Sequence, residues 1–80
     1  MTTRHDILTQ SIEARENDIM LYQINIDNYR AAIADIEANH ADLSDFADQL
    51  RDLLQSSLRE QKKEQVMLAA IKANLEKTSV

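Results

Sequence analysis

Apolar residues in the first half of the chain recur at alternating steps of three and four, in a register that runs from His5 to Leu43. This is the heptad pattern of a coiled coil, and isoleucine fills four successive positions of it. The pattern predicts a helix over residues 3–39, and Thr3 with Asp6 three residues later is a typical pair at a helix start. The predicted seam residues of this helix are Leu8, Ile12, Ile19, Tyr22, Ile26, Tyr29, Ile33 and Ile36.

The second half carries apolar residues at a spacing close to one α-helical turn. This spacing predicts a second helix over residues 45–77 that is apolar near both ends. Its middle is polar, because Ser57, Gln61 and Glu64 share the same face. The predicted seam residues of this helix are Phe46, Leu50, Leu53, Leu68, Ile71 and Leu75.

An acidic break over residues 40–44 separates the two patterns and predicts a turn. Because the chain has no Gly, Asn39 is expected to take the left-handed conformation that ends the first helix. Asp42 or Ser44 is expected to cap the second helix.

Folding the chain back at this turn sets the polar middle of the second helix against a polar interruption of the first. Arg15 then lies beside Glu64 as a buried polar pair, so that each group satisfies the other. The predicted fold class is all-α, an antiparallel two-helix hairpin that is coiled-coil-like and forms a single domain over residues 1–80. A single long helix is the structural alternative, and the acidic break argues against it.

A second apolar stripe on the first helix lies away from the seam. Its large residues are Met20, Leu21 and Ile24, and alanines continue it toward the turn. A two-helix chain of 80 residues closes only a small core, so the stripe is predicted to bind a second copy. The expected product is a homodimer or higher oligomer in which two hairpins form a four-helix bundle. A monomeric hairpin that reserves the stripe for a foreign partner is the alternative.

The composition narrows the function classes further. The chain contains no Gly, Pro, Cys or Trp, which excludes glycine-rich phosphate loops, disulfides and thiolate zinc sites. Its net charge of -5 is typical of a soluble acidic protein. The longest apolar run is three residues and no signal-peptide segment follows Met1, so we expect a cytoplasmic protein without membrane association.

Candidate chemistry in the sequence is sparse. His5 and His40 lie at opposite ends of a helix about 50 Å long, and a two-helix surface offers no deep pocket. We therefore predict no enzymatic activity, no catalytic residue and no cofactor. Glu37 and His40 have the Glu-x-x-His spacing of di-iron helical bundles, but the second helix offers no core glutamate to match them. The preferred interpretation is a surface carboxylate and a helix-terminal histidine, with no metal.

Five acidic residues cluster around the break, and no Lys or Arg occurs between residues 31 and 50. Such a field repels nucleic-acid phosphates and attracts a basic protein surface, so we expect a protein partner and no direct nucleic-acid binding. A role in solubility alone is the alternative. The basic residues Arg59, Lys62 and Lys63 alternate with glutamates and are interpreted as ordinary helix pairs. The members of this acidic tip are Asp35, Glu37, Asp42, Asp45 and Asp48.

Two segments resemble the small all-helical accessory proteins encoded by tailed bacteriophages. They are NDIMLYQINIDNYRAAI at residues 17–33 and LRDLLQSSLREQKKEQVML at residues 50–68. The resemblance implies a phage-encoded inhibitor or modulator that works in the host-cell cytoplasm and occludes a surface of a host protein, such as a basic or nucleic-acid-binding one. The predicted function is therefore a non-enzymatic protein-protein interaction module. A structural coiled-coil assembly protein and a carboxylate-bridged metal-binding bundle are the alternatives.

Overall fold

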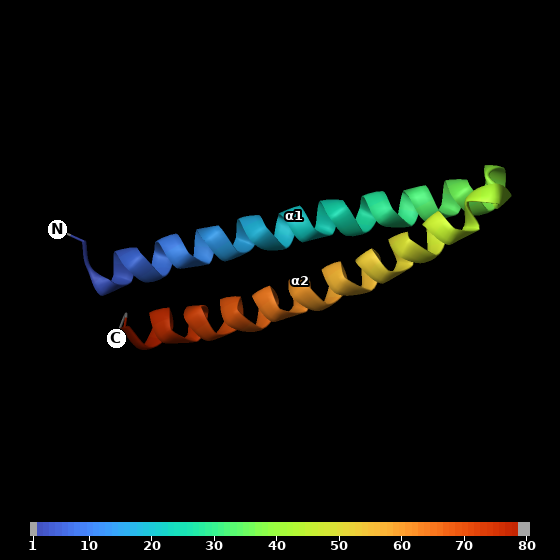
Figure 1. The fold of residues 1–80 in the computed structure, drawn as a ribbon. Coiled ribbons are helices and arrows are strands. Elements are labelled where there is room, and N and C mark those ends of the chain that lie inside the picture. The colour runs from blue at the N-terminus through green and yellow to red at the C-terminus, as the bar shows by residue number, and fades with distance from the viewer. Residues whose placement is uncertain (1, 79–80) are drawn as a thin grey trace.

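Two long helices lie side by side in an antiparallel hairpin (Figure 1). The computed structural model describes residues 2–78. Helix α1 spans Arg4–Asn39, the short 3-10 helix η1 spans Ala41–Leu43, and helix α2 spans Ser44–Thr78. The 36 residues of α1, at about 1.5 Å per residue, account for most of the 59 Å length of the molecule. The predicted all-α hairpin is therefore confirmed.

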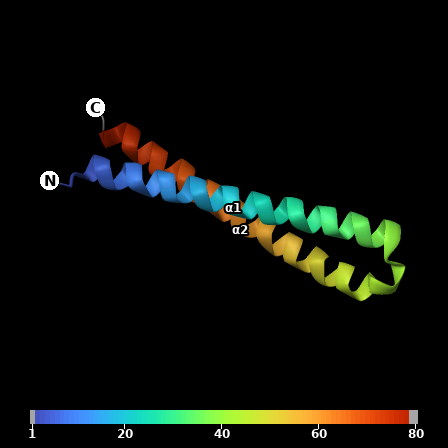
Figure 2. The same ribbon diagram turned by 90° about the horizontal axis from the view of Figure 1, so that it is seen from above.

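The two helices remain in contact along their length and cross at a shallow angle when seen from above (Figure 2). A shallow crossing is the packing that a heptad seam produces, because supercoiling keeps the same positions of each helix facing its neighbour. The start of α1 and the end of α2 lie together at one end of the molecule, and the turn lies at the other (Figure 1).

Helix α1 begins with the capping arrangement that the sequence predicts. The Thr3 hydroxyl accepts a hydrogen bond from the Asp6 backbone N–H at 3.1 Å, and the Asp6 carboxylate accepts one from the Thr3 backbone N–H at 3.3 Å. Each side chain therefore satisfies a backbone donor that the first turn of a helix leaves without a partner.

The turn is built differently from the prediction, and the expected left-handed Asn39 is wrong. No described residue has a positive φ, and Asn39 remains inside α1, where its side chain donates to the Asp35 carboxylate at 2.8 Å. His40 leaves the helix at φ -139° and ψ 59°, and η1 follows directly. The His40 N–H donates to the Ile36 carbonyl at 2.8 Å, and the Leu43 N–H donates to the His40 carbonyl at 2.9 Å. One non-helical residue and one tight helical turn thus reverse the chain without glycine.

The fully buried apolar residues lie mainly toward the turn. Ile36, Ala47 and Leu50 form one cluster, against which Tyr29, Ala32 and Ile33 pack. Ile26 is completely buried farther along α1. These residues come from both helices, so the same contacts that bury them hold the hairpin closed near the turn.

The seam of α2 differs from the predicted one at Phe46 and Leu53. These side chains are 47% and 48% exposed, whereas the neighbouring Ala47 is buried and Leu54 is half-buried. The observed seam follows heptad steps of three and four, so Phe46 and Leu53 fall on its flank. The short turn also holds the helices close together, which suits the small Ala47 better than a phenyl ring. The other predicted seam residues of both helices are buried or half-buried.

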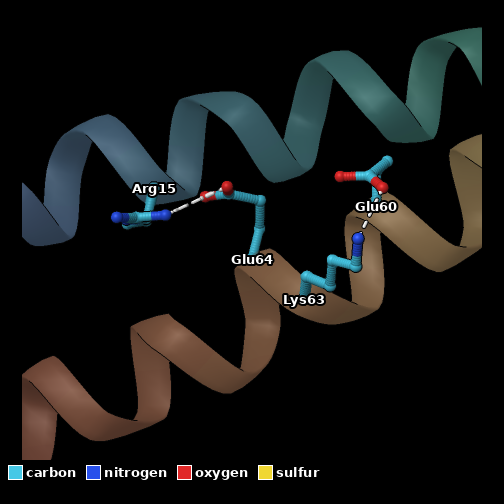
Figure 3. A network of polar contacts seen from close by, with 4 residues as sticks. All are labelled: Arg15, Glu60, Lys63 and Glu64. Carbon is cyan, nitrogen blue, oxygen red and sulfur yellow. Dashed lines mark hydrogen bonds and ion pairs between the residues drawn. The ribbon is translucent and has the colours of Figure 1, made fainter.

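The seam is polar in its middle, and half-buried apolar residues continue it to the open end. Arg15 donates to both carboxylate oxygens of Glu64 at 3.0 Å, which forms the predicted pair across the hairpin (Figure 3). The two side chains are 34% and 20% exposed, so the pair is partly exposed rather than buried. Gln61 is buried, and its amide donates to the Ile19 carbonyl at 3.2 Å and to the Gln23 side chain at 3.0 Å. Polar groups therefore bridge the helices beyond the last fully buried apolar side chain.

Candidate protein-binding surfaces

The acidic tip is less uniformly negative than the sequence suggests, because Arg51 reaches it from the next turns of α2. Its guanidinium donates to the Glu37 carboxylate and, at 2.7 Å, to the Asp48 carboxylate. The hydrogen bond to Glu37 raises the pKa of Arg51. The expectation that the tip has no basic neighbour is therefore wrong. It rested on chain position alone, whereas Arg51 approaches Glu37 from the opposite helix.

Of the remaining tip residues, Asp35 contacts other side chains, whereas Asp42 and Asp45 make no ion pair among the described residues. Asp35 lies 3.3 Å from the His40 imidazole and accepts the hydrogen bond from Asn39. Asp42 and Asp45 have no ion-pair partner in the part of the chain that the structure describes. These two carboxylates, at the turn itself, are therefore the members of the tip that no described side chain pairs with.

Exposed apolar side chains lie directly beside these two carboxylates. Leu43 is 42% exposed and Phe46, the single phenylalanine of the chain, is 47% exposed. Leu53 continues the same edge of α2 two helical turns farther on. We call this surface the turn-end patch, and its members are Asp42, Leu43, Asp45, Phe46 and Leu53. The sequence feature that indicates this patch is the seven-residue spacing of Phe46 and Leu53, which places both at the same flanking position of the heptad.

The predicted second apolar stripe is exposed on the face of α1 turned away from α2. Met20, Leu21 and Ile24 are 62%, 60% and 50% exposed. Helix α1 shows almost no hydrophobic asymmetry around its axis, whereas α2 is clearly amphipathic. Helix α1 is therefore apolar on two faces, one of which α2 covers. A shallow hollow on this exposed side is lined by Glu13, Glu16, Asn17 and Met20, and we call it the acidic outer face.

A second hollow lies on the outside of α2 and was not predicted as a surface. Val66 and Met67 are 62% and 44% exposed there. The interpretation of its basic residues as ordinary helix pairs holds only for Lys63, which pairs with Glu60 at 2.9 Å within α2 (Figure 3). Among the described residues, Arg59 and Lys62 make no ion pair. We call this hollow the basic outer face, and its lining residues are Arg59, Lys62, Lys63, Val66 and Met67.

Glu37 and His40, the two residues of the Glu-x-x-His element, contact different side chains and not a shared site. Glu37 pairs with Arg51 and His40 lies against Asp35, so each of the two has its own neighbour. Within residues 2–78, no three His, Asp or Glu side chains gather closely enough to hold a metal ion. Neither described helix contains an apolar stretch long enough to cross a membrane.

Comparisons with protein-family models, with curated protein sequences and with solved structures found no match for this chain. The exposed surfaces that the hairpin presents are the turn-end patch, the acidic outer face and the basic outer face.

Proposed function

We propose that this chain is a non-enzymatic protein-binding module whose turn-end patch holds a partner protein. The observation that carries the proposal is the half-exposed Phe46 beside the unpaired carboxylates of Asp42 and Asp45. An aromatic side chain that fills a pocket of the partner is a typical energetic anchor of an interface. Neighbouring charges add orientation and speed of association.

The chemistry of the patch defines the kind of partner. A partner surface needs an apolar pocket for the phenyl ring of Phe46 and a basic rim for Asp42 and Asp45. Both helices run without interruption into the turn, so the patch is presented at the end of a rigid rod 59 Å long. Binding there would block whatever the partner surface normally contacts. The resemblance to phage accessory proteins makes a bacterial host protein with a basic or nucleic-acid-binding surface the specific version of this proposal.

Two matched variants test the proposal. Phe46→Ala removes the anchor, and Ile7→Ala is its control, because Ile7 has a similar exposure of 54% and belongs to none of the three named surfaces. Tagged forms of the protein and both variants would be incubated with bacterial extract. Proteins captured by the unmodified chain would be identified by mass spectrometry, and the affinity of the purified partner measured by calorimetry.

We expect Phe46→Ala to weaken binding about 30-fold or more, an effect of about 2 kcal/mol, and Ile7→Ala to leave it unchanged. The double change Asp42→Lys and Asp45→Lys should reduce the association rate and its dependence on salt. Equal affinities of the Phe46 and Ile7 variants would show that the turn-end patch is not the binding surface.

A structural assembly role is the second candidate, and the opposite charges of the two outer faces favour it. This role does not use the turn-end patch, so the variants above separate the two candidates.

A further inference from the structure

The acidic and basic outer faces have complementary chemistry. The acidic outer face combines the carboxylates of Glu13 and Glu16 with the exposed Met20. The basic outer face combines cationic side chains, two of which have no ion-pair partner among the described residues, with exposed Val66 and Met67. Neither hollow contains a side chain of the other sign. Each hollow therefore offers an apolar centre and a charge that the other would neutralise.

The two faces lie on opposite sides of the hairpin. Asn17 is two residues from each of the seam residues Arg15 and Ile19, and at about 100° per residue it points away from the seam. Val66 stands in the same relation to Glu64 and Leu68 on α2. One copy therefore cannot bring its own two faces together, whereas a neighbouring copy can offer the matching face.

The two faces also lie at the same level along the molecule. The contact of Arg15 with Glu64 and that of Ile19 with Gln61 place residues 13–20 of α1 level with residues 59–67 of α2. A second hairpin laid beside the first without a shift along the long axis brings its basic outer face against the acidic one. The alternation of antiparallel helices then continues from one copy to the next.

The surface area of the hairpin supports such a contact. The chain exposes 5935 Å². A compact folded monomer of 80 residues exposes about 4900 Å², so the hairpin carries an excess of about 1000 Å². One partner buries about 800 Å² in an interface of standard size. The excess surface of the hairpin is therefore enough for one such contact with a second copy.

We propose that copies of this chain stack side by side, with the acidic outer face of one copy packed against the basic outer face of the next. Symmetric pairing of two α1 outer faces would oppose carboxylates with carboxylates, and symmetric pairing of two α2 outer faces would oppose cations with cations. Both arrangements are electrostatically unfavourable compared with the unlike pair. Because the two surfaces of this contact differ, each copy leaves one face open for the next, which builds a chain or a closed ring.

The mass of the unmodified protein tests the stacking first. Sedimentation velocity over a range of concentrations should show a weight-average mass that rises beyond two copies of the 9.2 kDa chain. A mass that stays at one copy, or stops at two copies, would overturn the proposal. The second result would instead indicate the symmetric four-helix bundle.

Charge reversal on each face separates head-to-tail stacking from symmetric pairing. One variant carries Glu13→Lys with Glu16→Lys, and the other carries Arg59→Glu with Lys62→Glu. All four side chains lie on the surface of the helices, so circular dichroism should show unchanged helicity. Each variant alone should sediment as one copy, because each has lost one of the two faces that the contact requires.

Mixing the two variants should restore assembly, since the reversed faces again have opposite charges. Asp18→Lys, an exposed reversal on the flank of α1, is the control and should leave the mass unchanged. Retained association of either double variant alone would show that a single face pairs with itself, and the proposal would then be wrong. Absence of recovery in the mixture would equally contradict it.

Discussion

The half of the hairpin next to the turn and the half at its open end share one heptad seam but are held together by different interactions. Residues 26–57, the turn half, contain every fully buried apolar side chain among the described residues. In the open half, formed by residues 4–25 and 58–77, Gln61 is the one side chain of described burial that is buried to a similar degree. Buried apolar packing holds the first half together, whereas the second combines half-buried apolar side chains with hydrogen bonds across the seam.

The difference shows how chain connectivity distributes a small core. The turn fixes the helices close together, so the small Ala47 and the larger Ile36 and Leu50 complete a cluster there. Farther from the turn, longer polar side chains span the seam, as Arg15 does toward Glu64. A hydrogen bond across a partly wet seam contributes less stability than a buried aliphatic side chain. The turn half should therefore contribute most of the stability of the hairpin.

The largest expected effect is the loss of a buried side chain in the turn half. Ile36→Ala should lower the free energy of unfolding by about 3 kcal/mol, because it leaves a cavity in the cluster with Ala47 and Leu50. Leu68→Ala is the matched change in the open half and should cost about 1.5 kcal/mol, since Leu68 is only half-buried. Urea unfolding followed by circular dichroism at one fixed protein concentration measures both. Equal losses at the two positions would remove the distinction between the halves.

A smaller change in the free energy of unfolding, this time an increase, is expected at the buried Gln61 of the open half. Gln61→Leu should stabilise the hairpin by about 1 kcal/mol, because an apolar side chain replaces a buried amide. The acceptors that remain are the side-chain oxygen of Gln23, an exposed residue that water can reach, and the Ile19 carbonyl, which lies inside helix α1. Gln61→Ala is the control and should destabilise the protein, since it removes packing as well. Destabilisation by leucine would show that the Gln61 hydrogen bonds contribute more than burial at this position.

The smallest expected effect concerns the ion pair across the open half. A double-mutant cycle on Arg15 and Glu64, with each changed to Ala, should give a coupling energy of about 0.5–1 kcal/mol that falls as salt is added. The Lys63 and Glu60 pair is more exposed, at 57% and 46%, and should give a coupling energy near zero. Similar coupling energies for the two pairs would mean that spanning the seam adds nothing to an ion pair.

Much of the fold follows from the sequence, because periodicity and capping are local properties. The heptad pattern indicates α1 and its seam, Thr3 and Asp6 indicate its start, and the contact between Arg15 and Glu64 follows from folding two patterns together. Each of these depends on residues whose spacing is fixed by helix geometry. The acidic tip and the apolar stripe around Met20 could be found in the same way.

The tertiary structure decided the features that depend on how the helices meet. A shift of one residue turns a side chain by about 100°, so the supercoil and the tight turn determine that Ala47 rather than Phe46 enters the seam. The same arrangement brings Arg51 to Glu37 across the hairpin, which chain position alone does not indicate. The sequence by itself determined two helices and a reversal between them. Only packing decided which apolar and charged side chains remain on the surface, because exposure depends on the neighbouring helix and not on the spacing of residues along one helix.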